Sequence, residues 1–98
     1  MRFVWDEAKN KINKQKHKLS FELAQKIFDD PGTLTWEDKR FEDYEEERWI
    51  SLGCINKIIV AVVVHTYKGE EDEQEIIRII SARKATKQEQ KIYFKHQK

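Results

Sequence analysis

The chain has 98 residues, 39% of them hydrophobic, and its 19 Lys and Arg against 18 Asp and Glu give a formal net charge of +1. This length is typical of one compact domain, residues 1–98, and a single cysteine excludes both an intramolecular disulfide and a cysteine-rich metal framework. The longest apolar run spans only 7 residues (58–64), and the N-terminus lacks the apolar stretch of a secretory signal, so we expect a cytoplasmic protein without a membrane partner.

The charges are distributed unevenly along the chain. Residues 1–28 carry 7 basic and 3 acidic side chains, residues 29–77 carry 5 basic and 14 acidic ones, and residues 78–98 carry 7 basic and 1 acidic. Two basic ends around an acidic middle are typical of a chain with interaction surfaces. The net charge of +1 therefore does not exclude a nucleic-acid partner.

The first residues predict a short strand followed by a basic helix. Residues 3–5 are a brief apolar stretch, and Asp6 is a good N-cap because its carboxylate can accept hydrogen bonds from the first helical amides. In the helix that follows, Ala8 and Ile12 share one face with the stem of Gln15, whereas five lysines occupy the other faces. We therefore expect the face with Ala8 and Ile12 to contact the core.

A second helix and a set of strands are predicted next. Ser20 is the N-cap candidate of the helix, apolar residues follow at 21, 24, 27 and 28, and Asp-Asp-Pro-Gly at 29–32 ends it. The pattern then changes to that of strands, at 33–36, 48–55, 57–67 and 75–83, with seven carboxylates in the loop 37–47 and an acidic turn at 68–73. The segment 57–67 is almost all aliphatic, as expected of a central strand covered on both faces.

The C-terminal segment predicts one more helix. Thr86 and Glu89 have the spacing of a capping box, in which each side chain bonds to the backbone amide of the other residue. The complete prediction is an α+β fold with two N-terminal helices, an antiparallel β-meander of about four strands and one C-terminal helix.

Several kinds of site are absent from the sequence. There is no glycine-rich phosphate loop and no dinucleotide-binding motif, so we expect no cofactor. His17, His65 and His96 lie too far apart in the sequence to have paired metal-ligand spacing, so we expect no metal site. Cys54 alternates with apolar residues of a strand, which favours a small buried hydrophobe over a nucleophile.

The basic segment 78–84 is the strongest candidate for a functional site. Alternation places Arg78 on one face with Ile76, Ile80 and Ala82, where an arginine needs a partner or a polar cleft. One interpretation is an internal ion pair with a carboxylate such as that of Glu47. The other is a phosphate-binding fork, because a guanidinium stays charged and offers two parallel donors to phosphoryl oxygens.

Arg83 and Lys84 lie where the last strand meets the last helix, either as solvated charges or as part of the same phosphate site. His65 ends the aliphatic strand and is either a hydrogen-bonded edge residue or a group for proton transfer, which imidazole performs well near neutral pH. Glu47 and Arg48 are either a surface ion pair or a base with its electrostatic partner.

Lys16 and His17 close the basic first helix, as a solvated face or as part of an RNA-binding surface. Taken together, these candidates point to phosphate or RNA chemistry without a metal.

Longer motifs resemble one family. They occur in this order: Phe3-x-Trp5-Asp6-x-Ala8-Lys9, Lys16-His17-x-x-Ser20-Phe21-Glu22-x-Ala24, Phe28-Asp29-Asp30-Pro31, Glu47-Arg48-x-Ile50-x-x-Gly53, Val62-Val63-Val64-His65-Thr66 and Arg78-Ile79-Ile80-Ser81-Ala82-Arg83-Lys84-Ala85-Thr86-x-x-Glu89. The chain resembles, over almost its whole length, the BrnT toxins of bacterial type II toxin–antitoxin modules. The last motif is the most specific. One departure is Lys18, where the family usually has a glycine that would ease a left-handed turn.

The resemblance implies a RelE-like fold and a ribonuclease toxin that cleaves RNA and arrests translation and growth. It also implies a BrnA-type antitoxin that neutralises the toxin, and a complex that represses its own operon by binding operator DNA through the antitoxin.

Metal-free RNA cleavage uses the ribose 2′-hydroxyl as nucleophile and needs a base, an acid and a group that stabilises the phosphorane. In this hypothesis Arg78 and Arg83 hold the phosphate and Arg48 orients the site. Glu47 and His65 are the alternatives for base and acid. The RNA-binding surface is completed by Lys16, His17 and Lys84.

Two other functions are compatible with the sequence. One is a non-catalytic module that binds RNA or a protein through its basic ends. The other is a small-molecule enzyme, which the lack of any cofactor motif disfavours.

Overall fold

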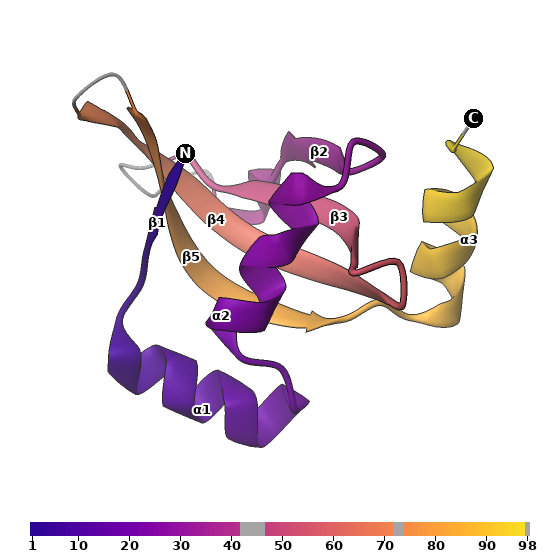
Figure 1. Cartoon of the computed structure of the whole chain (residues 1–98), viewed down its shortest axis with the longest axis horizontal. Coiled ribbons are helices and arrows are strands. Elements are labelled where there is room, and N and C mark those ends of the chain that lie inside the picture. The colour runs from indigo at the N-terminus through magenta and orange to yellow at the C-terminus, as the bar shows by residue number, and fades with distance from the viewer. Residues whose placement is uncertain (42–46, 72–73, 98) are drawn as a thin grey trace.

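The computed structural model describes residues 1–41, 47–71 and 74–97 (Figure 1). The helices are α1 (Glu7–His17), α2 (Phe21–Ala24) and α3 (Lys87–Lys95), with short 3-10 helices η1 (Gln25–Asp29) and η2 (Lys39–Phe41). The strands are β1 (Arg2–Val4), β2 (Leu34–Glu37), β3 (Trp49–Ile55), β4 (Ile59–Glu71) and β5 (Gln74–Lys84). Part of the predicted acidic loop, residues 42–46, and two residues of the predicted acidic turn, 72–73, lie outside the described residues.

The strands form one five-stranded sheet in the order β1-β5-β4-β3-β2. The α+β class is confirmed, but the prediction of an antiparallel meander of about four strands is wrong in two respects. The short strand predicted at residues 3–5 is present as β1, but it joins the sheet as a fifth strand, and it runs parallel to β5, with Arg2 opposite Ile76. The sheet is therefore mixed. The pairing of β1 with β5 could not be predicted, because a parallel neighbour far away in the sequence leaves no local hairpin signal.

The two faces of the sheet carry two separate apolar cores. On one face α2 and η1 contribute Phe21, Ala24 and Ile27, which pack against residues of β4 and β5 such as Val63 and Ile79. On the other face Tyr93 of α3 packs against β3 and β4. Figure 1 shows α1 and α2 together at one end of the molecule and α3 at the other. Because α3 is short, it covers only part of its face.

The helix caps are those that the sequence predicts. The carboxylate of Asp6 accepts from the amides of Ala8 and Lys9, and Ser20 accepts from Leu23. The second helix is shorter than predicted, because the backbone changes to 3-10 geometry after Ala24.

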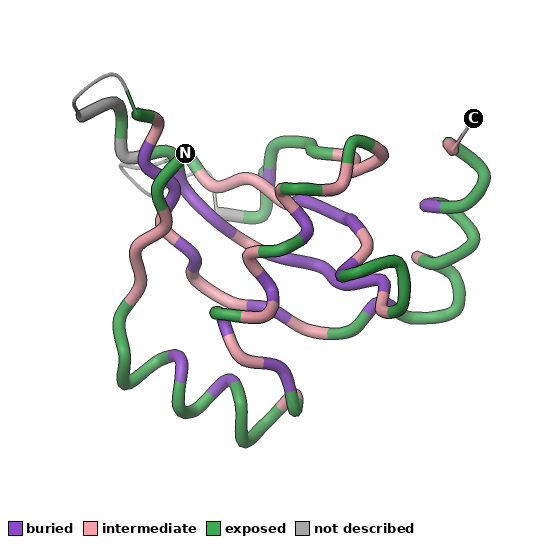
Figure 2. Tube along the Cα trace, viewed as in Figure 1, coloured by how far each residue is buried: buried purple, intermediate pink, exposed green. Residues whose placement is uncertain are grey.

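The buried face of α1 is not the one that hydrophobic spacing predicts. Ile12 is 62% exposed and Ala8 is also exposed, whereas Asn10 and Asn13 are buried. Asn13 acts as a partner for the edge of β5: its Nδ2 donates to the carbonyl of Ala82 at 2.8 Å, and its Oδ1 accepts from the Ala82 amide at 3.2 Å. α1 is therefore anchored by polar contacts, and a side-chain amide satisfies backbone groups that a further strand would otherwise pair. Figure 2 shows these two buried positions on α1, whose other residues are exposed except for the partly buried His17.

A bulge decides which side chains of β5 share a face. Alternate residues of β4 point to one face, and their direct partners on β5 point to the same face. The partners across this face are Val62 with Arg83, Val64 with Ser81 and Thr66 with Arg78. The register shifts between Val64 and His65, so Ile80 has no direct partner. Arg78 and Arg83 therefore share a face, although residues five apart in a regular strand would not. The predicted common face of Arg78 and Ala82 is wrong, because Ala82 lies opposite Val63 in the other core.

Candidate nucleic-acid interface

The face of the sheet that carries Arg83 has a hollow of about 480 Å³ beside α3. Four of its residues form one row across the sheet, because each lies directly opposite the next: Trp36, Ile50, Val64 and Ser81. The hollow is completed at its sides by Lys16, His17, Arg40, Val62, Ala82, Arg83 and Glu89. Cationic side chains from α1, η2 and β5 therefore surround a largely aliphatic floor. We call this the cationic hollow.

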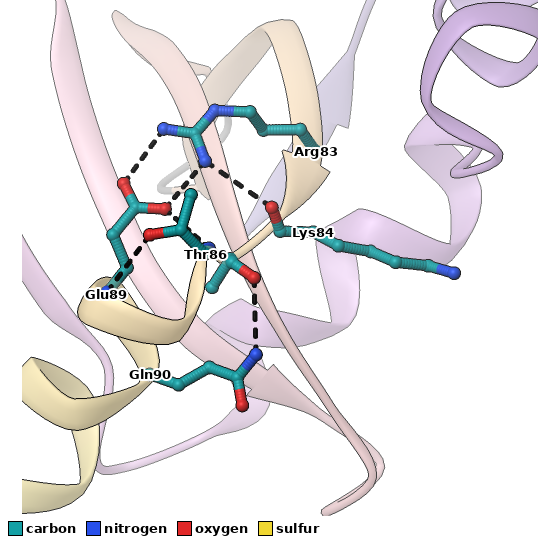
Figure 3. Close-up of polar contacts among 6 residues, drawn as sticks. Arg83, Lys84, Thr86, Glu89 and Gln90 are labelled. Carbon is teal, nitrogen blue, oxygen red and sulfur yellow. Dashed lines mark hydrogen bonds and ion pairs between the residues drawn. The ribbon is translucent and has the colours of Figure 1, made fainter.

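Arg83 is fixed in the cationic hollow by the first turn of α3. Its Nη1 donates to Oε1 of Glu89 at 2.7 Å and its Nη2 donates to Oε2 at 2.9 Å (Figure 3). Oε1 of Glu89 also accepts from the Thr86 amide at 2.9 Å, and Thr86 Oγ1 accepts from the Glu89 amide, so the predicted capping box is present. The hydrogen bonds from Arg83 lower the pKa of Glu89 to about 2, and the same contact raises the pKa of Arg83. Both groups are charged throughout the neutral range.

Arg40 is held by a second bidentate ion pair. Its Nε and Nη2 each donate to Asp38 at 2.8 Å, and the Asp38 amide donates to the carbonyl of Arg48 at the start of β3. The hydrogen bonds from Arg40 lower the pKa of Asp38. The positive charge of Arg40 also opposes the rise in the pKa of Arg83. The two guanidinium groups thus face the same hollow, and each is paired with its own carboxylate.

The end of α1 supplies a lysine and a histidine to the hollow. Lys16 and His17 belong to its last turn, and Lys18 closes the helix in a left-handed conformation with φ 58°. The position of this turn is fixed by Asn13, which bonds to Ala82 next to Arg83 on β5. A polar contact between a helix and a strand edge therefore brings residues 16–17 beside residue 83.

His65 lies away from the cationic hollow, in the core on the face covered by α2 and η1. It is 0% exposed, its Nε2 is 2.8 Å from Oγ of Ser51, and no hydrogen bond satisfies its buried Nδ1. Phe28 and Tyr67 pack edge-on against its ring. Burial lowers the pKa of His65 to about 4. At neutral pH it is an uncharged core residue without access to RNA.

The remaining predicted site residues are dispersed. Lys84 lies opposite Ala61, and its side chain points away from that of Arg83 in Figure 3. Glu47 is exposed and Arg48 is partly buried just before β3, where the charge of Arg48 contributes to the lowered pKa of Asp38. Arg78 shares the face of Arg83 but is not among the residues that line the cationic hollow. Of the eight predicted site residues, the hollow brings together Lys16, His17 and Arg83.

Two residues of the cationic hollow were missed by reasoning from the sequence. Trp36 is 44% exposed on the edge strand β2, and Arg40 follows β2 directly. The sequence carried only weak signals for these two residues. Lys39 and Arg40 are the only basic residues within the acidic segment 37–47, and Trp36 is an aromatic residue in a short strand.

A second hollow, of about 510 Å³, lies between η1, the β3–β4 turn and α3. Its charges are mixed, with Lys26 and Lys57 against Asp29 and Asp30, so it is less suited to a polyanion. Cys54 lines it and is partly buried, and burial raises the pKa of its thiol, which disfavours a nucleophilic thiolate.

Within residues 1–41, 47–71 and 74–97, no cluster of three or more His, Cys, Asp or Glu side chains has an arrangement that could hold a metal ion. In the same part of the chain, no helix has the length and apolar character needed to cross a membrane.

An α+β chain with arginines, a lysine and an exposed tryptophan around one open sheet face has the features of a small nucleic-acid-binding domain. The family model described as "Ribonuclease toxin, BrnT, of type II toxin-antitoxin system" matches residues 5–89, and the chain belongs to this family. The predicted family is thus confirmed, and membership implies an antitoxin partner.

A solved structure supports the same assignment. The structure, titled as the Brucella abortus ribonuclease toxin BrnT, is similar to this chain with a TM-score of 0.67 and 25% sequence identity. The similarity covers 89% of this chain and 99% of the Brucella chain. No curated protein matches the chain significantly in sequence.

Proposed function

We propose that residues 1–98 form a single toxin domain of the RelE-like fold class that cleaves RNA as an endoribonuclease without a metal and thereby arrests translation and growth in the cytoplasm. The observation that carries the proposal is the cationic hollow, where Lys16, His17, Arg40 and Arg83 converge on one open face. Family membership supports the reaction class. The charges and geometry support the assignment of residues within it.

The chemistry is an attack of the ribose 2′-oxygen on the adjacent phosphorus. A base takes the 2′-hydroxyl proton, the bond from phosphorus to the 5′-oxygen breaks, and an acid protonates that oxygen. The products are a 2′,3′-cyclic phosphate and a 5′-hydroxyl end. Arg83 and Arg40 stabilise the extra negative charge on the phosphorane, and Lys16 binds the neighbouring phosphate.

The proton-transfer group in this proposal is His17. Of the two residues expected to be base or acid, His65 is fully buried and Glu47 lies outside the cationic hollow. His17 lines the hollow and is partly exposed, and an imidazole can both accept and donate a proton near neutral pH. In this proposal Glu47, Arg48, Arg78 and Lys84, which do not line the hollow, take no part in the chemical step or in binding the cleaved phosphate.

The test is a cleavage assay with purified, antitoxin-free protein and a labelled RNA. We expect Arg83→Ala and His17→Ala each to slow cleavage by roughly a hundredfold. Lys84→Ala is the matched control, because Lys84 is the neighbour of Arg83 on β5 but its side chain faces away from the hollow. The cleavage rate of Lys84→Ala should stay near that of the parent. Full activity of both Arg83→Ala and His17→Ala would refute the assignment of residues. Activity that vanishes in chelator and returns with a divalent cation would refute the metal-free part.

A non-catalytic binding module is the second candidate, and one observation favours it. Both terminal nitrogens of Arg83 are already engaged by Glu89, so a phosphate must displace this carboxylate or bind at the outer edges of the guanidinium. The same assay distinguishes the two candidates. RNA that is retained by the protein but never fragmented supports the binding module.

We further propose that the antitoxin is of the BrnA type, neutralises the toxin, and carries the operator-DNA contacts through which the complex represses its operon. Growth arrest on expression of the chain alone, relieved when the antitoxin is expressed with it, is the expected result. Toxin without antitoxin should fail to shift operator DNA in a gel. A shift by the toxin alone would contradict this division of roles.

A further inference from the structure

We propose that the cationic hollow takes single-stranded RNA laid across the strands, with one base stacked on the ring of Trp36. This inference rests on the proposed ribonuclease function. It adds the substrate class and a residue that selects single-stranded over double-stranded RNA.

Trp36 presents a large aromatic surface on the open face of the sheet. It is 44% exposed, although indole is among the side chains that gain most from burial. It stands directly opposite Ile50 on β3, so it shares the face of the cationic hollow and lines its β2 side. Exposed aromatic rings on a sheet are the usual platform on which RNA-binding domains stack bases.

The distance across the row suits a short stretch of RNA. Trp36 and Ser81 are the ends of a row with three interstrand spacings, which at about 4.8 Å each gives about 14 Å. Ile50 and Val64 lie between them and form an aliphatic floor. Arg83 occupies the adjacent row on the β5 side. An RNA strand can therefore place one base on Trp36 while a phosphate further along the strand reaches Arg83.

The cations lie where the backbone of such a strand would pass. Arg40 follows β2 and is bonded to Asp38, so it is fixed close to Trp36. Arg83 and the end of α1 bound the other side. The hollow thus alternates aromatic, aliphatic and cationic surface, which matches the bases, riboses and phosphates of a single strand.

A duplex does not fit this arrangement. Bases in a duplex are stacked on each other and paired, so their faces cannot reach an indole ring, whereas bases in a single strand can be splayed out. Stacking also uses the face common to all bases. The inference therefore predicts binding that depends on single-strandedness and tolerates changes of base.

The experiment compares Trp36→Leu with Trp36→Phe. Both variants keep an apolar side chain on the edge strand, but only phenylalanine keeps a ring that can stack. The probe is a short fluorescent all-2′-O-methyl RNA, which cannot be cleaved because its 2′-oxygen is blocked, used single-stranded and annealed to its complement. We expect Trp36→Leu to weaken binding of the single strand by roughly tenfold to a hundredfold and Trp36→Phe by only a few-fold. The duplex should bind weakly to all three proteins.

A cleavage assay run in parallel separates this inference from the proposed function. If the parent cleaves RNA but Trp36→Leu binds the single strand like the parent, or if the duplex binds equally well, the stacking inference is wrong and the ribonuclease proposal stands. If the parent neither binds nor cleaves, the proposed function itself fails. If Trp36→Leu keeps RNA affinity but loses antitoxin, the ring belongs to a protein interface and the inference is overturned. Unchanged circular dichroism verifies that the variant is folded.

Discussion

Arg83 and Glu89 are joined by two parallel hydrogen bonds of 2.7 and 2.9 Å, and the same carboxylate caps the helix that follows. The pair connects the end of β5 to the start of α3. The orientation of Arg83 and the N-terminal cap of α3 therefore both depend on the side chain of Glu89. Two substitutions of Glu89 can separate these contributions.

We expect Glu89→Gln to destabilise the protein by about 0.5–1 kcal/mol, because it removes the charge at a partly exposed ion pair but keeps an N3 group able to accept the Thr86 amide. Glu89→Ala removes the cap as well and should cost about 1–2 kcal/mol in total. Urea denaturation measures both. Equal losses would mean that the charge contributes everything and the cap nothing.

A second prediction concerns Asn13. Asn13→Ala leaves the amide and carbonyl of Ala82 and the carbonyl of Leu19 without their partner in the interior, so we expect a loss of about 2–3 kcal/mol. Ile12→Ala, one residue earlier on the exposed face, should change the free energy of unfolding by less than about 0.5 kcal/mol. Hydrophobic spacing alone predicts the reverse order. Chemical denaturation of the two variants therefore tests the docking of α1 directly.

Lys18 provides a prediction of increased stability. Its φ of 58° at the end of α1 is the left-handed conformation that glycine adopts without steric cost. Lys18→Gly should raise the free energy of unfolding by about 0.5–1 kcal/mol. Lys14→Gly, inside the same helix, should lower it by about 1 kcal/mol. Loss of stability in both variants would show that the lysine side chain has a stabilising contact that outweighs its backbone strain.

The buried His65 should make the stability depend on pH. Its pKa is about 4 in the folded protein but near 6.5 when unfolded, so the unfolded chain binds the proton first as the pH falls. The part of the free energy of unfolding that depends on uncharged His65 is complete above pH 6.5 and is lost between pH 6.5 and 4. The total loss is about 3 kcal/mol. At lower pH, protonation of Glu89 destabilises the protein further. This loss extends from the ordinary pKa of a glutamate down to about 2, the lowered pKa of Glu89 in the folded protein.

Denaturation at pH 7.5 and at pH 5 measures the His65 contribution. His65→Gln should abolish most of the decrease between these two pH values, whatever its own stability. His96→Gln serves as the control, since His96 is exposed and the decrease should persist. An unchanged decrease in His65→Gln would assign the acid sensitivity to the carboxylates instead.

Local features of the fold could be predicted from the sequence, because local interactions determine them. The caps at Asp6, Ser20 and Thr86 follow from the bonding of one side chain to amides two or three residues away. The docking of α1 could not be predicted in this way. The partner of Asn13 lies 69 residues further along the chain, and no periodicity indicates that an asparagine will pair with a strand edge.

The candidate site was predictable to a similar extent. Arg83 was identified because it lies in an almost acid-free basic segment, and Lys16 and His17 because they end a basic helix. His65 was expected to end its strand, as a hydrogen-bonded edge residue or as a proton-transfer group, but β4 continues to Glu71 and His65 is buried. The common face of Arg78 and Arg83 depends on a bulge that simple alternation cannot reveal.

The parallel pairing of β1 with β5 has a consequence for the order in which the protein can be made. Arg2 is synthesised well before its partner Ile76, which follows 74 positions later. Arg83 and Glu89 come later still, so the cationic hollow cannot exist on a nascent chain until Glu89 has been translated. A ribosome that has not yet passed this residue therefore holds a chain in which the hollow is incomplete.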